Sequence, residues 1–198
     1  MSDEPSPAVD EVDLARSREY SLLSVLLLRS PNAQFLGQLA ALAGDASPIG
    51  AAHAALAEAA RRLDVERVGR EYFNLFVGVG RGELLPYASF YLTGSLHGRP
   101  LAVLRQTLQR LGIERIADLK EPEDHAGVLC EIMAGLAGGS LAAPANAIQE
   151  FFVEHLAPWM GRLFHDLERA ESADFYASVG ALGRRFMEIE IESLALPA

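Results

Sequence analysis

The sequence has little cysteine and few basic side chains relative to acidic ones. The single cysteine, Cys130, excludes an internal disulfide and a zinc site built on paired cysteines, and it suits a reducing compartment such as the cytoplasm. Seventeen Lys and Arg residues stand against 27 Asp and Glu residues, which gives a formal net charge of −10. Because nucleic acids and anionic membranes attract clustered basic residues, neither is an expected partner, and cationic partners are favoured.

Long apolar runs are also missing. The most apolar stretch, LLSVLLL at residues 22–28, is far shorter than the ~20 residues that a membrane span needs. The opening segment, MSDEPSPAVDEVD, is acidic where a secretory signal would be basic. We therefore expect a cytoplasmic protein that is neither exported nor inserted stably in a membrane.

Composition and periodicity favour an all-α fold. The chain has 198 residues, of which 50% are hydrophobic and 22% charged, as in an ordinary globular domain with a sizeable core. Leu and Ala dominate, and helix-period stretches are separated by Gly, Pro and Asp. We predict a polar tail over residues 1–13 and a single-domain multi-helix bundle over residues 14–198.

The expected helices follow from this punctuation. The segment from Gly78 to Ser95 is rich in glycine and aromatic residues and is predicted to be an ordered loop that leads into a short turn. Pro158 marks a kink or a new helix start. The alternating MEIEIE near the C-terminus keeps a helical period with the residues before it and is predicted to be helical. The other predicted helices are 14–29, 32–43, 50–63, 65–77, 100–111 and one that runs from Pro122 to about residue 137.

The stretch KEPEDH, residues 120–125, concentrates acidic residues. If Pro122 is the first helical residue, Glu123 and Asp124 fall in the first turn, where carboxylates interact favourably with the helix dipole. That alone would account for them. Six acidic and two basic residues between Glu114 and Glu131 also leave a local charge of −4, which would attract a basic peptide.

A catalytic or metal site is a poorer interpretation of the same residues. Neighbours on a helix point about 100° apart, so Asp124 cannot easily orient His125. No two histidines are four residues apart and no HExxH motif occurs, so no metal and no cofactor is expected; the five histidines are His53, His97, His125, His155 and His165.

The glycines at 78, 80 and 82 follow a predicted helix instead of a strand and lack the GK[ST] ending of a phosphate loop, which favours a connector. A small helical phosphate-ester or nucleotide hydrolase that uses Asp124 and His125, with these glycines holding phosphate, is the enzymatic alternative.

Four segments together resemble one family. They are EYFNLFVG at 71–78, LPYASFYL at 85–92, EPEDH at 121–125 and FFVEHLAPWMGRLFHDL at 151–167. In this order they are similar to the motifs of the TorD/DmsD/NarJ group of cytoplasmic chaperones for molybdenum-containing oxidoreductases. Tyr87 stands where others have Trp, and Ala88 where many relatives have Gly or an acidic residue, so the preference for a client is expected to differ.

The resemblance implies a non-enzymatic, system-specific chaperone with an all-helical fold. Such a chaperone binds the twin-arginine leader peptide and the apo form of a molybdopterin-containing oxidoreductase, assists cofactor insertion and delays export. The identity of the client is open, and so is the choice between a monomer and a domain-swapped homodimer.

The resemblance also implies a binding site. We assign Glu121, Glu123 and Asp124 to the cationic part of the leader and His125 to a hydrogen bond at the rim of the groove. For Phe76 the alternative is an ordinary core position, and for Ser89, which is included in the site, it is a cap of the following turn. The apolar part of the leader is assigned to Tyr72, Phe76, Pro86, Tyr87 and Tyr91.

Overall fold

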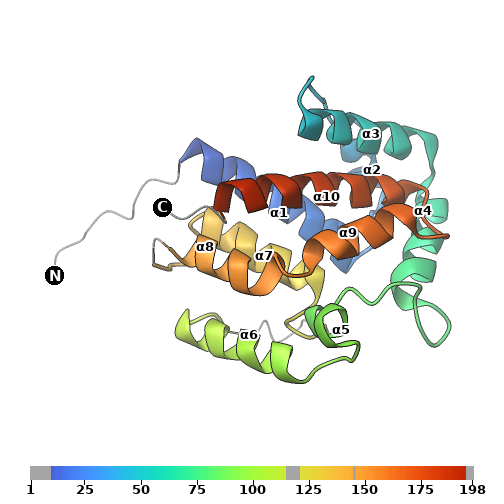
Figure 1. Ribbon diagram of the computed structural model, residues 1–198. Helices are drawn as coiled ribbons and strands as arrows, with labels where there is room; N and C mark the ends of the chain where they lie inside the picture. Colours follow the sequence, from blue (N-terminus) through green and yellow to red (C-terminus); the bar gives the residue numbers. More distant parts are fainter. Residues whose placement is uncertain (1–9, 115–120, 145, 195–198) are drawn as a thin grey trace.

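The computed structural model describes residues 10–114, 121–144 and 146–194, and within them all regular structure is helical (Figure 1). In these ranges no helix combines the length and apolarity that crossing a membrane requires. The prediction of an all-α fold is confirmed. The elements are α1 (Glu11–Leu28), α2 (Ala33–Ala40), α3 (Pro48–Arg62), α4 (Val65–Tyr72), the π-helix η1 (Phe73–Val77), α5 (Ala88–Thr93), α6 (Arg99–Arg110), α7 (Ala126–Ala137), α8 (Ala147–Phe151), the π-helix η2 (Phe152–Leu156), α9 (Met160–Arg169) and α10 (Phe175–Leu194).

The first four helices begin where a polar side chain caps them. Such a residue satisfies a backbone N–H that has no partner within the helix. Because Asp10 caps α1, this helix begins at Glu11, three residues before the predicted start. The residues that accept these hydrogen bonds are Asp10, Asn32, Ser47 and Asp64.

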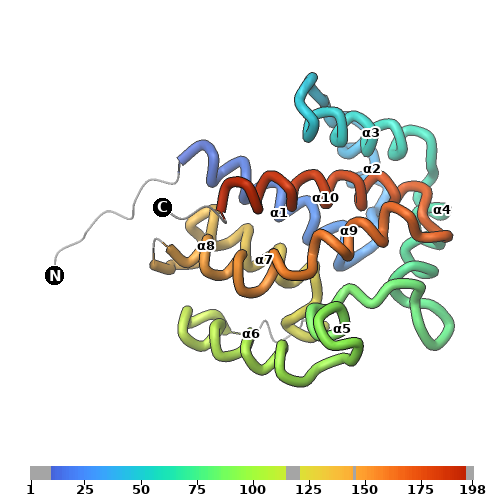
Figure 2. Tube along the Cα trace, viewed as in Figure 1, coloured from blue at the N-terminus to red at the C-terminus, as the bar shows by residue number. Residues whose placement is uncertain are grey.

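The bundle is organised around its first and last helices. α1 packs along α7, and α10 packs against α9 and α3. The pair α5 and α6 forms a separate layer on the far side of α7 and α9 from α10, as the tube in Figure 2 shows. The last helix runs through MEIEIE as predicted, and Cys130 is fully buried in the core.

Two π-helical turns interrupt the regular helices. In each, a backbone N–H bonds to the carbonyl five residues earlier: Gly78 to Phe73 at 2.7 Å and Ala157 to Phe152 at 2.9 Å. The predicted helix over 65–77 is therefore α4 followed by η1. Around Pro158 the chain breaks between η2 and α9, as the sequence predicts for a proline inside a helical pattern.

The glycine-rich segment after η1 is an ordered loop. Gly78 has a φ of 62°, and a Cβ atom there would collide with the backbone carbonyl of Arg81. The backbone N–H of Leu84 donates to the carbonyl of Leu75 at 2.8 Å, which ties the loop back to η1. The chain then enters the short α5, in agreement with the predicted loop and turn.

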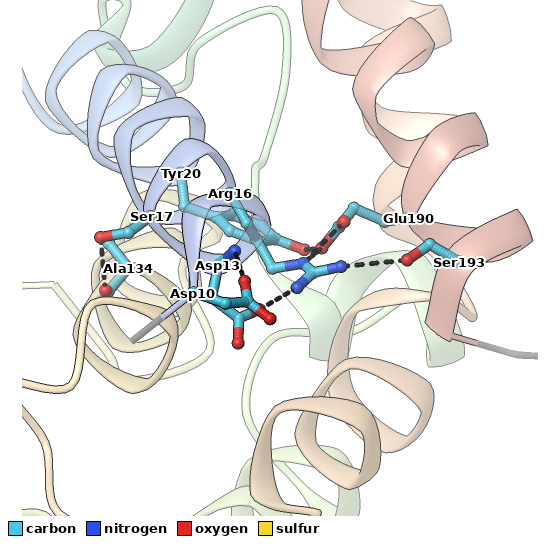
Figure 3. Close-up of polar contacts among 8 residues, drawn as sticks. All are labelled: Asp10, Asp13, Arg16, Ser17, Tyr20, Ala134, Glu190 and Ser193. Carbon is cyan, nitrogen blue, oxygen red and sulfur yellow. Dashed lines mark hydrogen bonds and ion pairs between the residues drawn. The ribbon is translucent and has the colours of Figure 1, made fainter. Parts of the chain in front are cut away.

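A buried ion pair joins α1 to α10 (Figure 3). The Arg16 Nε atom lies 2.9 and 3.0 Å from the two carboxylate oxygens of Glu190, and the Tyr20 hydroxyl donates to the same carboxylate at 2.9 Å. Arg16 also donates to Ser193, at 3.0 Å. Burial raises the pKa of Glu190, while Arg16 and Tyr20 act in the opposite direction. This cluster fixes the start of the first helix on the end of the last.

Candidate functional site

The loop before α5 and the segment before α7 pair with each other through their backbones. Tyr87 and His125 form an isolated antiparallel bridge. The N–H of Ala88 donates to the carbonyl of Asp124 at 2.9 Å, and the N–H of Ala126 donates to the carbonyl of Pro86 at 2.8 Å. The structure thus brings together two of the sequence motifs, PYAS at 86–89 and EPEDH at 121–125.

This pairing corrects the predicted start of the helix. α7 begins at Ala126 and not at Pro122, with His125 in an extended conformation as its N-cap. Glu123 and Asp124 therefore lie in a turn before the helix, closed by a 3.0 Å hydrogen bond from the N–H of His125 to the carbonyl of Pro122. The sequence favours Asp124 in the first helical turn, near the helix dipole. In the structure its hydrogen bonds with Ala88 and Ser89 hold it in the preceding turn instead.

Asp124 points into the protein and supports α5. Its side chain is 1% exposed, and its Oδ2 accepts a 2.9 Å hydrogen bond from the N–H of Ser89, in the first turn of α5. The N-cap residue of α5, Tyr87, makes no side-chain capping bond, so Asp124 fills that role from a distant part of the chain. Ser89 is fully buried, and its hydroxyl accepts from the N–H of His97 at 2.9 Å instead of capping a turn.

Tyr87 and Glu121 are the half-buried, outer part of the site, with the half-buried Tyr72 beside them. His125 packs beneath them and is only 4% exposed, so its predicted place at the rim of a groove is wrong. The Tyr87 hydroxyl donates to Glu121 Oε2 at 2.6 Å, and its ring meets the His125 ring edge-on at 5.1 Å. Burial, and after it the hydrogen bond to Glu121, raises the pKa of Tyr87. Burial and the Glu121 charge raise the pKa of Tyr72 to about 12. A half-buried carboxylate is therefore held among aromatic rings.

His125 is neutral at physiological pH. Burial lowers its pKa to about 4, against the opposing influence of the Glu121 and Asp124 charges. Its Nδ1 accepts a 3.0 Å hydrogen bond from the N–H of Gly127, which places the ring proton on Nε2. His125 thus caps α7 and packs on Tyr87 at the same time.

Glu123 is already engaged within the protein. Its carboxylate is 8% exposed and meets the Arg105 guanidinium of α6 through two contacts, at 3.1 and 2.8 Å. This pair anchors the turn before α7 to α6. The local charge that the sequence assigns to this stretch is reduced accordingly; Arg115, Asp118 and Lys120 lie outside the described residues.

The other predicted site residues are Tyr72, Phe76, Pro86 and Tyr91, and they do not form one surface. Tyr72 and Phe76 stack at 5.2 Å, and both contact the buried ring of Tyr176, so Phe76 is partly a core residue. Pro86 is buried under the loop. Tyr91 makes different contacts, and its ring lies 5.4 Å from that of the buried Trp159.

Tyr91 belongs to a contact with α9. Its hydroxyl donates to Asp166 at 2.9 Å, its ring lies 5.7 Å from the Arg162 guanidinium carbon, and Arg162 also donates to its carbonyl. Burial raises the pKa of Tyr91, and the hydrogen bond to Asp166 adds to the shift. Sequence spacing could not identify Asp166, Arg162 or Arg105, because each meets its partner across a distance of 18 to 75 residues in the chain.

The arrangement does not assemble a hydrolytic pair. Asp124 Oδ2 and His125 Nδ1 each accept a backbone N–H, from Ser89 and Gly127, so the two side chains serve separate structural roles. What faces outward is a carboxylate, Glu121, beside the phenol of Tyr87. Such a surface can bind a cation. A guanidinium group donates hydrogen bonds to a carboxylate, and it is also attracted to the face of an aromatic ring.

Comparison with known proteins identifies relatives of this chain. It is 27% identical over 213 residues to the chaperone protein TorD of Shewanella loihica, with 95% of this chain and 98% of that protein covered. It is 29% identical over 119 residues to a Haemophilus influenzae protein assigned as the Tat proofreading chaperone DmsD, covering 59% and 57% of the two chains. These relatives are named as chaperones and not as catalysts, in agreement with the expected absence of enzymatic activity.

A solved structure and a family model agree with these relatives. The crystal structure of an Archaeoglobus fulgidus protein assigned to redox enzyme maturation matches with a TM-score of 0.55 at 20% identity, covering 94% of this chain and 99% of that one, and so shows the same fold. The family model described as nitrate reductase delta subunit matches residues 42–165, which include all ten predicted site residues. The chain therefore belongs to the nitrate reductase delta subunit family, the group of redox enzyme maturation chaperones that its motifs resemble.

Proposed function

We propose that this protein is a cytoplasmic chaperone that binds the twin-arginine leader peptide and the apo form of a molybdopterin-containing oxidoreductase, assists cofactor insertion and delays export. The observation that carries the proposal is the carboxylate of Glu121, held by the Tyr87 hydroxyl at 2.6 Å beside the ring of His125. The names of the relatives, TorD and a Tat proofreading chaperone, support the same function.

The chemistry of a leader peptide fits this surface. A guanidinium group needs a carboxylate for charge-assisted hydrogen bonds and gains from an aromatic face beside it. Glu121 and Tyr87 offer both. The formal net charge of −10 adds a long-range attraction for a cationic segment.

The acidic residues take different roles in this proposal. Glu121 contacts the arginine side chains directly. Glu123 is shared with Arg105, so an incoming arginine competes with an ion pair that already exists. Asp124 is buried and acts through position, because it holds the loop of Tyr87 and the start of α5 in place. His125 is buried and supports the Tyr87 ring from within the protein.

A calorimetric titration with a panel of twin-arginine leader peptides from molybdoenzymes, at low and moderate salt, tests the proposal. We expect one leader class to bind and its affinity to fall as salt rises, because exposed charge pairs are screened. Glu121→Gln should weaken that binding, whereas Glu131→Gln, an identical charge change at an exposed site on α7, should not. Absence of binding to every leader would refute the function.

A further inference from the structure

A pocket lies between α5, α6, α7 and η2. Its volume is about 230 Å³. The walls are mostly apolar and consist of Ala88 and Leu92 from α5, Val103 and Leu104 from α6, and Leu129 from α7. Leu92 is 43% exposed, so the lining includes a large apolar side chain that is open to solvent.

His155 of η2 adds one unsatisfied polar group to this pocket. The side chain is 7% exposed and its ring lies 4.9 Å from that of Phe151. Its Nε2 is buried and makes no hydrogen bond to any described residue; Glu154 Oε2 lies 3.5 Å from it. Burial lowers the pKa of His155, so the ring is neutral at pH 7 and Nε2 can form one hydrogen bond with an amide group.

Size and charge restrict what the pocket can hold. A cavity of about 150 Å³ already accommodates a benzene ring, whereas pockets for cofactors and drug-sized ligands begin at about 300 Å³. The volume therefore suits one large aliphatic or aromatic side chain better than a nucleotide. Arg99 and Glu154 contribute one charge of each sign to the lining, so they favour a neutral occupant.

The pocket and the Glu121 surface are built on neighbouring residues of one segment. Ala88 lines the pocket, and the residue before it, Tyr87, binds Glu121. Asp124 holds this segment in place. Its backbone carbonyl accepts a hydrogen bond from the N–H of Ala88, and its side chain accepts one from the N–H of Ser89. Consecutive Cα atoms are about 3.8 Å apart, so the two backbone positions are close enough for a bound peptide of several residues to span them.

We propose that this pocket binds an apolar side chain of the neutral segment of the leader peptide, while a backbone amide of the same segment pairs with His155 Nε2. This inference rests on the proposed function. It assigns the apolar part of the leader to α5, α6 and η2, and the cationic part to Glu121 and Tyr87. It also gives the π-helical turn η2 a role, because π-bulges inside helices are frequent at functional sites.

Calorimetry on the full chain tests the inference with two peptides. One is a twin-arginine leader that the wild type binds; the other has its apolar residues replaced by serine. Val103→Phe fills the pocket, and Leu92→Asp places a charge in its lining. Ile189→Asp is the matched control, because Ile189 is 38% exposed on α10 and does not line the pocket. Circular dichroism melts verify folding, and Leu92 is exposed enough for its replacement to leave the core intact.

We expect Val103→Phe and Leu92→Asp each to weaken the intact leader by about tenfold or more, the effect of losing one buried apolar side chain. Binding of the serine peptide should be the same for both variants and the wild type, and Ile189→Asp should bind as the wild type does. Undiminished binding of the intact leader by both variants would overturn the inference and leave the proposed function standing. A wild type that binds no leader would instead refute the proposed function, and this inference with it.

Discussion

Replacing Asp124 with alanine should loosen the contact between α5 and α7. The substitution removes the acceptor of the Ser89 N–H, at 2.9 Å. Ser89 is fully buried, so water cannot take over this bond. A hydrogen bond to a charged group is worth about 1.5 to 3 kcal/mol, and the second oxygen, Asp124 Oδ1, is buried without a partner among the described residues, which reduces the net value.

We therefore expect Asp124→Ala to lower the free energy of unfolding by about 2 kcal/mol. For a chain of this length that corresponds to a fall in Tm of roughly 4 to 8 °C. Asp124→Asn should lose less than half as much, because an amide oxygen can still accept from Ser89. Urea unfolding followed by circular dichroism measures all of these differences.

Asp64→Ala provides the matched control. Asp64 also accepts one backbone N–H, from Arg67 at 2.8 Å, but it is exposed at the start of α4. Its loss should cost about 1 kcal/mol, as for an ordinary helix cap. If Asp124→Ala costs no more than Asp64→Ala, Asp124 does not fix α5 and the positional role given to it is wrong.

Three further predictions use the same unfolding assay. Arg16→Met should lower the free energy of unfolding by about 3 to 5 kcal/mol, because it leaves the Glu190 charge buried without its partner. The double variant Arg16→Met with Glu190→Leu should recover most of that loss, and no recovery would contradict the account of this ion pair. Glu71→Ala should cost about 2 to 4 kcal/mol, since this buried carboxylate accepts three backbone N–H groups at the start of α10, whereas Glu66→Ala, at an exposed site of α4, should change stability by less than about 0.5 kcal/mol. The pKa of His125 is about 4 in the folded protein, below its ordinary 6.5. Its contribution to stability is therefore present above pH 6.5 and is lost as pH falls toward 4. Between pH 7 and pH 5 the free energy of unfolding of the wild type should fall by about 2 kcal/mol more than that of His125→Gln, and equal losses would refute this.

Local pattern was sufficient to predict most helices. Helical periodicity identified α10 through MEIEIE. Pro158 correctly marked the break before α9. These features depend on the properties of neighbouring residues, so a single sequence carries them.

The site itself depends on contacts between distant segments. The acidic turn before α7 was predicted as a helix start, because proline and carboxylates favour one locally. In the structure the pairing of Asp124 with Ala88 and Ser89 prevails. The Glu123–Arg105 ion pair and the capping of α5 from Asp124 arise the same way, and no spacing rule within one segment predicts them.

The most direct test of the account is a double-mutant cycle between the protein and the leader. Calorimetry would measure Kd for the wild type and Glu121→Gln, each with an intact leader and with one whose paired arginines are replaced by glutamine. We predict that each single change weakens binding by about tenfold and that the two together cost little more, because they remove the same interaction. Additive losses, or no loss from Glu121→Gln, would show that Glu121 does not bind the arginines and would contradict the account.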